Sequence, residues 1–210
     1  MDRRGFFVVA WGGLASSFGT LGCRCKQTGH VMKCDEKDMV GSHAAGTEVF
    51  KPLIDESVSK LLARQSVVPA GGTPGTKSIC FVGLENKSSE PLGDFKDQIT
   101  QIIDNDINQS GAFHQISSRF VEAGLKTARL RPDELFVPAN QRAFRTVMEQ
   151  QGQPFDYLLF ATLTSGTTQN NANSQKDYLL TLELVNLQTG VPDKESAMIR
   201  KGYTKSHGLR

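Results

Sequence analysis

The sequence lacks an excess of either charge. Its 210 residues carry 24 basic and 22 acidic side chains, a formal net charge of +2, and no run of five basic residues occurs in it. Proteins that bind nucleic acid neutralise phosphates with clustered lysine and arginine, which would show as a basic stretch. Nothing in the charge pattern predicts a nucleic-acid partner.

Cysteine is also scarce. Three of the four cysteines lie near the N-terminus, and only Cys80 lies deeper in the chain. Four cysteines so placed do not form a disulfide framework for a domain of this size. Cys80 sits in a short apolar run, so we expect a buried core side chain there.

Catalytic motifs are absent as well. The sequence contains no G-x-S-x-G, no H-E-x-x-H, no P-loop and no dinucleotide fingerprint. His43, His114 and His207 are far apart, and Asp104 and Asp106 would point to different sides of a helix. The prediction is a non-catalytic binding module with no metal and no cofactor.

Residues 1–23 have the pattern of an export signal. Arg3 and Arg4 precede a stretch, residues 6–22, that has no charge and is rich in small residues. Such a stretch fits a cleaved signal better than a spanning helix, which needs about 20 strongly apolar residues, although an uncleaved anchor is the alternative. The two arginines followed by glycine and two phenylalanines resemble a twin-arginine signal.

Cys23 ends this segment after Leu21 and Gly22, which resembles a bacterial lipoprotein cleavage site. We therefore expect Cys23 to be the lipid-bearing residue, and its acyl chains to hold the protein at a membrane. Two alternatives stay open. Cys23, Cys25, His30 and Cys34 approach the spacing of a zinc knuckle, and Cys25 and Cys34 would be able to pair in an oxidising compartment.

Residues 24–46 are polar and without periodicity, which predicts a flexible tether. Fully extended it spans at most about 80 Å, and as a coil about 26 Å. Residues 47–210 form the predicted domain. Periodic apolar positions predict helices from residue 47, around 95–107, at 118–127 and at 139–150, and strands at 78–84, 113–116, 156–164, 178–187 and 196–203. Residues 165–176 are rich in Asn, Gln, Ser and Thr and predict a loop.

This order of elements predicts an α+β fold with a mixed sheet of four to five strands and with helices packed on one face. Along the strand 156–164, Tyr157, Leu159, Ala161 and Leu163 should face the helices. The opposite face would then be open and centred on an aromatic ring with polar neighbours, the anatomy of a binding hot spot. The residues expected to bind a partner are Phe160, Thr162, Thr181 and Glu183. We hypothesise that Phe160→Ala abolishes binding and leaves the fold intact, the alternative being that Phe160 is covered and fills a minor core.

Several of these segments together resemble the LpoB-type lipoprotein activators of penicillin-binding proteins. The segments that carry the resemblance are residues 50–61, 85–88, 111–113, 157–160 and 182–190. The wider group shares its topology with the N-terminal domain of TolB and with CsgG-type lipoproteins, so the resemblance implies a TolB-N-like fold.

The resemblance also implies a function. Proteins of this group sit in the outer membrane, face the periplasm, and activate a class A penicillin-binding protein in peptidoglycan synthesis. The short tether favours a close partner or an inner-membrane anchor. The alternative is a structural or assembly subunit of another envelope complex, like CsgG or TolB.

Overall fold

The structure is a computed structural model that describes residues 44–66, 77–170 and 173–204. The chain divides into two units, residues 1–37 and 38–210, and every described residue belongs to the second unit. No helix in the described ranges is long and apolar enough to cross a membrane. The elements are α1 (Thr47–Ser66), β1 (Lys77–Lys87), α2 (Phe95–Gln109), β2 (Phe113–Gln115), α3 (Ser118–Ala128), the 3₁₀ helix η1 (Pro132–Phe136), α4 (Pro138–Gln150), β3 (Tyr157–Gln169), β4 (Asn173–Asn186) and β5 (Pro192–Thr204).

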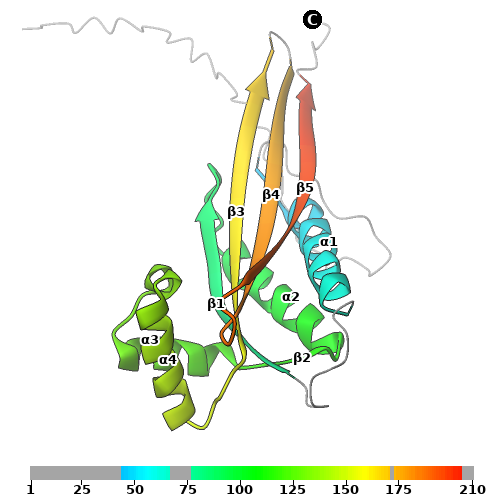
Figure 1. The fold of residues 1–210 in the computed structure, drawn as a ribbon. Helices are drawn as coiled ribbons and strands as arrows, with labels where there is room; N and C mark the ends of the chain where they lie inside the picture. The colour runs from blue at the N-terminus through cyan, green and yellow to red at the C-terminus, as the bar shows by residue number, and fades with distance from the viewer. Residues whose placement is uncertain (1–43, 67–76, 171–172, 205–210) are drawn as a thin grey trace, which may run out of the picture. The chain divides into compact units, whose positions relative to one another are not determined.

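The five strands form one mixed sheet in the order β2-β1-β3-β4-β5. β1 is parallel to both of its neighbours, whereas β3, β4 and β5 are antiparallel. Figure 1 shows these last three strands running side by side, with β1 beside β3. The α+β class and the mixed sheet predicted from the sequence are confirmed.

One face of the sheet, here called the first face, packs against α1 and α2. Apolar side chains at every second position of β3 and β4, most of them leucines, meet apolar side chains of the two helices, among them Leu53 and Ile103, both fully buried. Tyr157, Leu159, Ala161 and Leu163 all belong to this core, as the alternation predicted.

The opposite face, the second face, is also covered over part of its area. Leu158 on β3 and Val185 on β4 pack with residues of α3, η1 and α4, including Leu135 and Phe144, in a second cluster. The expectation that helices lie on one face only is therefore wrong. In Figure 1, α3 and α4 lie together on one side of the sheet, and α1 lies on the other side.

The second core depends on a close contact between α3 and α4. A Cβ atom on Gly124 of α3 would lie 2.4 Å from Sδ of Met148 and 3.0 Å from Cε2 of Phe144. A larger residue at this position would therefore force Met148 to shift and would crowd the ring of Phe144.

The hairpin between β3 and β4 is longer than the sequence indicated. Residues 165–176 were expected to form a loop, but the strands stay paired through Gly166–Asp177 and Thr168–Gln175 up to Gln169–Ser174. The signal was missed because this end of the hairpin extends beyond the helices (Figure 1) and its polar side chains do not alternate with apolar ones. β5 likewise begins at Pro192, earlier than expected.

Two ion pairs brace the first face at this end of the sheet. Lys201 of β5 donates to Glu48 of α1 at 2.8 Å and to the carbonyl of Ala44 at 2.7 Å. Lys176 of β4 pairs with Glu90, which also accepts a 3.2 Å hydrogen bond from Oη of Tyr178. The hydrogen bond from Lys176 holds the pKa of Glu90 below its usual value, although partial burial acts in the opposite direction.

Candidate interaction site on the second face

The four residues expected to bind a partner lie next to one another on two paired strands. Thr162 of β3 is opposite Thr181 of β4, and Phe160 is opposite Glu183. All four side chains share the second face, since they have the same parity as Leu158 and Val185 of the second core. The sequence therefore grouped these residues correctly.

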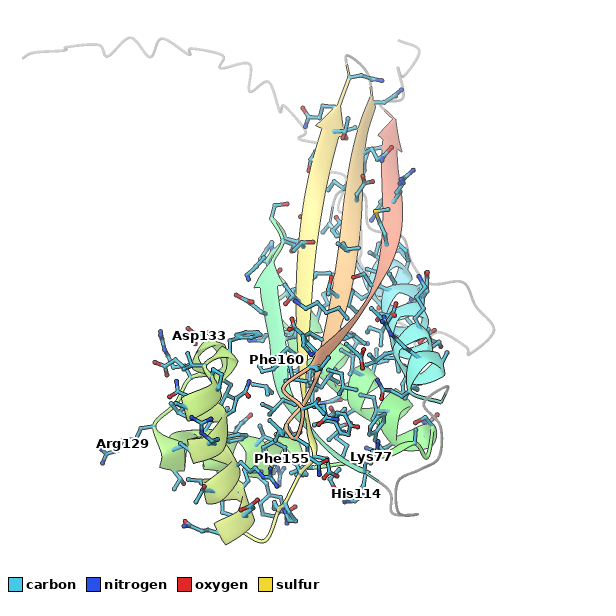
Figure 2. All side chains as sticks on the ribbon, viewed as in Figure 1. Lys77, His114, Arg129, Asp133, Phe155 and Phe160 are labelled. Atoms are coloured by element: carbon cyan, nitrogen blue, oxygen red, sulfur yellow. The ribbon has the colours of Figure 1, made fainter. Side chains whose placement is uncertain are left out.

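Phe160 is not open to solvent, however. Its exposed fraction is only 7% because the ring of Phe136, from η1, stacks on it with centroids 4.5 Å apart and planes tilted by 25°. Figure 2 places Phe160 where the sheet meets the helical layer, with Asp133 of η1 nearby. The expectation of an uncovered Phe160 is wrong, and the alternative of a covered Phe160 in a minor core is confirmed, because α3, η1 and α4 extend over this part of the sheet.

The exposed aromatic ring of this site is Phe136. It is 51% exposed while resting on Phe160. Sequence reasoning missed it because residues 132–138 lie between two predicted helices and contain two prolines but no periodic apolar pattern. A usable signal was present: Leu135, Phe136 and Val137 form an apolar triplet between two prolines, and only Leu135 is buried.

Polar side chains border the stacked rings. Glu183 forms a 2.8 Å ion pair with Lys194 of β5, and the hydroxyls of Thr181 and Ser196 lie 2.9 Å apart. The second face thus changes at Phe160, from the apolar contacts of the second core to a polar strand surface.

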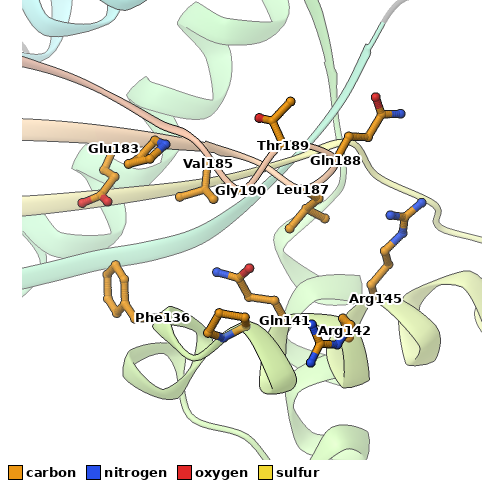
Figure 3. A pocket seen from close by; sticks show the side chains of 12 residues that line it. Phe136, Gln141, Arg142, Arg145, Glu183, Val185, Leu187, Gln188, Thr189 and Gly190 are labelled. Carbon is orange, nitrogen blue, oxygen red and sulfur yellow. The ribbon is translucent and has the colours of Figure 1, made fainter.

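A hollow of about 410 Å³ lies on one side of the stack, between α4 and the turn that joins β4 to β5. Figure 3 shows Phe136, Gln141 and Arg145 on the helical side, across from Val185 and Leu187. Arg142 and Arg145 both line it. Arg145 is paired with Glu149 at 2.8 Å, and Arg142 has no ion pair with any residue in the described ranges.

A larger hollow of about 740 Å³ lies on the other side of the stack, along β1. We call it the β1 groove. Phe136 belongs to both hollows, so the Phe136–Phe160 stack forms a ridge between them. Four acidic side chains and one lysine line the groove: Glu85, Lys96, Asp97, Glu122 and Asp133.

The described residues show no arrangement suited to catalysis by a nucleophile or a metal. Cys80 is completely buried, as expected, and burial raises the pKa of its thiol far above the usual value. His114 is exposed on β2, and no group of three or more metal-ligating side chains occurs in the part of the chain that the structure describes. The predicted lipidation residue Cys23 and the predicted export residues Arg3 and Arg4 lie outside the described residues.

An α+β domain with an exposed aromatic ridge between two hollows has the features of a binding protein. The family model for the peptidoglycan-synthase activator LpoB matches residues 50–192 of the chain. This match covers most of the domain and most of the chain, and the protein belongs to the LpoB family.

Solved structures from three bacteria are similar to the chain. The C-terminal domain of LpoB from Salmonella enterica is 16% identical, with a TM-score of 0.49, covering 71% of this chain and 97% of that one. LpoB from E. coli is 13% identical, with a TM-score of 0.44 and coverages of 96% and 94%. Lipoprotein GNA1162 from Neisseria meningitidis is 20% identical, with a TM-score of 0.44 and coverages of 63% and 88%. No match was found among curated proteins.

Proposed function

We propose that this protein is a non-catalytic envelope lipoprotein that binds a class A penicillin-binding protein and raises its peptidoglycan-synthesising activity. Membership of the LpoB family, carried by residues 50–192, is the observation that supports this proposal most directly. The proposed partner is the synthase itself, and no cofactor takes part.

The contact surface in this proposal is the ridge of Phe136 on Phe160, together with Thr162, Thr181 and Glu183. An aromatic side chain that is half exposed in the free protein loses its remaining contact with water when a partner covers it. Aromatic anchors surrounded by polar groups are typical of binding hot spots, where one truncation costs about 2 kcal/mol or more. Phe136 fits this description better than Phe160, which is already buried.

The test is stimulation of a purified class A synthase, measured as the rate of glycan polymerisation against activator concentration. Phe136→Ala should shift the half-maximal concentration upward by about 30-fold, which corresponds to 2 kcal/mol. Its thermal midpoint should stay within a few degrees of the wild type, because half of the ring is already in water. Phe120→Ala is the matched control, since Phe120 is 46% exposed on α3 and lines neither hollow.

Equal shifts in the half-maximal concentration for the Phe136 and Phe120 variants would show that the ridge is not part of the contact surface. Phe160→Ala is a poor first test, because truncating a buried phenylalanine typically costs about 3–5 kcal/mol of stability. A lack of stimulation by the wild-type protein with every class A synthase of its own cell would contradict the proposed function altogether.

The proposal includes a lipid anchor on Cys23, in the outer membrane facing the periplasm or in the inner membrane, reached through the twin-arginine signal at Arg3 and Arg4. Metabolic labelling with an alkyne fatty acid should mark the wild-type protein and the control Cys25→Ala, but not Cys23→Ala. Only the cysteine at the cleavage site becomes acylated in such a signal. Labelling that persists in Cys23→Ala would exclude this anchor.

A further inference from the structure

Most of one edge of the sheet has no neighbouring strand. β2 pairs with β1 only at Lys77, Ser78 and Ile79, whereas β1 continues along β3 as far as Lys87. From Cys80 to Lys87, the side of β1 that faces away from β3 has no strand partner among the described residues, and Figure 1 shows this free edge. A free edge presents backbone N–H and C=O groups that are able to pair with another chain.

The β1 groove follows this free edge. Residues 81–86 of β1 line it, flanked on one side by Lys96, Asp97 and Thr100 of α2. The opposite wall comes from α3 and η1, with Val121, Leu125 and Phe136 as its apolar members. An extended segment placed along the edge would therefore lie between two walls and alternate its side chains between them.

The groove carries an excess of negative charge. Glu85, Asp97, Glu122 and Asp133 outnumber Lys96, the one basic residue that lines it. Glu85 is paired with Lys87 at 2.9 Å and Asp133 with Arg131 at 3.3 Å. Neither of these two basic partners lines the groove. Asp97 and Glu122 have no ion pair with any other described residue, so their charges are free to attract a basic occupant.

We propose that the β1 groove binds an extended segment of a partner protein in which basic and apolar residues alternate, and that this segment adds to β1 as a further strand. Main-chain hydrogen bonds to the free edge would supply affinity, and the two walls would supply specificity. The apolar side chains would face Val121, Leu125 and Phe136, and the basic ones would face Asp97. This inference goes beyond the proposed function, because it holds whether or not the segment belongs to the synthase.

A second copy of the chain is the less favourable occupant. Edge-to-edge pairing of two β1 strands would bring two acidic grooves together. β1 also has a bulge between Phe81 and Gly83, where the register with β3 shifts, and bulges twist an edge away from flat self-pairing. A flexible basic segment is able to follow that twist.

The test uses the full ¹⁵N-labelled chain in mild detergent and a defined probe, the acetylated and amidated peptide Lys-Val-Lys-Val-Lys-Val-Lys. Strand addition should slow amide hydrogen exchange within residues 81–87. Two further peptides carry N-methyl groups at all the odd or all the even positions. One of these two should bind at least 10-fold more weakly than the parent, because only alternate amides of an added strand face β1.

The charge contribution is tested with Asp97→Lys, on the wall that faces the basic side chains, and this variant should weaken binding of the parent peptide about 10-fold in 50 mM salt. Asp55→Lys is the matched control, since Asp55 is an exposed acidic residue of α1 outside the groove, and it should leave binding within twofold. Unchanged exchange in residues 81–87, or equal binding of all three peptides, would overturn strand addition. Protection of the same amides without peptide, together with a dimeric mass, would show that a second copy occupies the edge and would also overturn the proposal.

Discussion

The two faces of the sheet differ in how far their apolar contacts extend. Among the described residues, the core on the first face contains 24 buried side chains, and the core on the second face contains 12. On β3, first-face residues stay apolar from Tyr157 to Leu163, whereas second-face residues change from Phe160 to Thr162. The first face is built for stability, and the second ends in a surface that is available for binding.

One ion pair on each face shows a similar difference in exposure. On the first face, Lys201 and Glu48 are nearly buried, with exposed side-chain fractions of 10% and 16%. On the second face, Lys194 is 57% exposed where it pairs with Glu183. Exposed pairs contribute little to stability because water screens them and ordering the side chains costs entropy. The pair of Glu183 and Lys194 is thus better placed for recognition than for stability.

The largest effect should come from truncating one residue in each core. Leu182→Ala on the first face and Phe144→Ala on the second should each destabilise the protein by about 2–5 kcal/mol, because both side chains are fully buried. The two variants should differ in which parts of the domain exchange their amide hydrogens faster. Leu182→Ala should speed exchange throughout the domain, whereas Phe144→Ala should speed it most in α3 and α4, whose contacts are restricted to the smaller core.

Equal acceleration of α3, α4 and the β3–β5 strands in both variants would contradict this difference and would make the two cores one cooperative unit. The control is the exposed α3 variant Phe120→Ala, in which exchange should stay close to that of the wild type. Chemical denaturation measures the free energy of unfolding of the same three proteins.

The first face was predictable from the sequence because both of its layers carry strong periodic signals. Alternating leucines such as Leu180 and Leu182 mark strands, and the three- to four-residue steps of α1 and α2 mark helices. The order of elements followed, and with it the adjacency of Phe160, Thr162, Thr181 and Glu183.

The coverage of the second face was not predictable in the same way. Leu158 and Phe160 looked like residues of an open face because nothing local shows that α3 and α4 return to the sheet. That packing involves Gly124, whose lack of a side chain leaves room for Phe144 and Met148. It also involves η1, which was not predicted because its segment contains proline and has no periodic apolar pattern. Both are tertiary contacts between segments that are distant in the chain, and periodicity within one segment does not report them.

A smaller effect should come from acid, acting through the ion pair of Glu90 and Lys176 on the first face. The hydrogen bond from Lys176 keeps the pKa of Glu90 below its value in the unfolded chain. A carboxyl whose pKa is depressed by folding adds stability above the unfolded pKa, and this contribution is lost as the pH falls through the folded pKa. Glu90→Gln should therefore lower the free energy of unfolding by about 1–2 kcal/mol at pH 7. The difference in this free energy between the variant and the wild type should become smaller as the pH falls below 4.

Urea unfolding of both proteins at pH 7, 5 and 3.5 measures this difference. The matched control is Glu85→Gln, which removes a carboxyl from the exposed pair with Lys87 on the second-face side. A constant difference between Glu90→Gln and the wild type across this pH range would show that the carboxylate charge of Glu90 does not contribute to stability.

The smallest effect on stability should come from the pair of Glu183 and Lys194, at the edge of the aromatic ridge. Lys194→Ala should lower the free energy of unfolding by less than about 1 kcal/mol, because the lysine is largely exposed. Glu183→Lys places a like charge opposite Lys194 and introduces a positive charge beside Phe136, so it should reduce stimulation of the synthase although the fold persists. Stimulation assays and thermal midpoints of both variants measure the two quantities separately. A Glu183→Lys variant that stimulates as well as the wild type would remove this acidic residue from the contact surface and restrict the binding role of the second face to its aromatic rings.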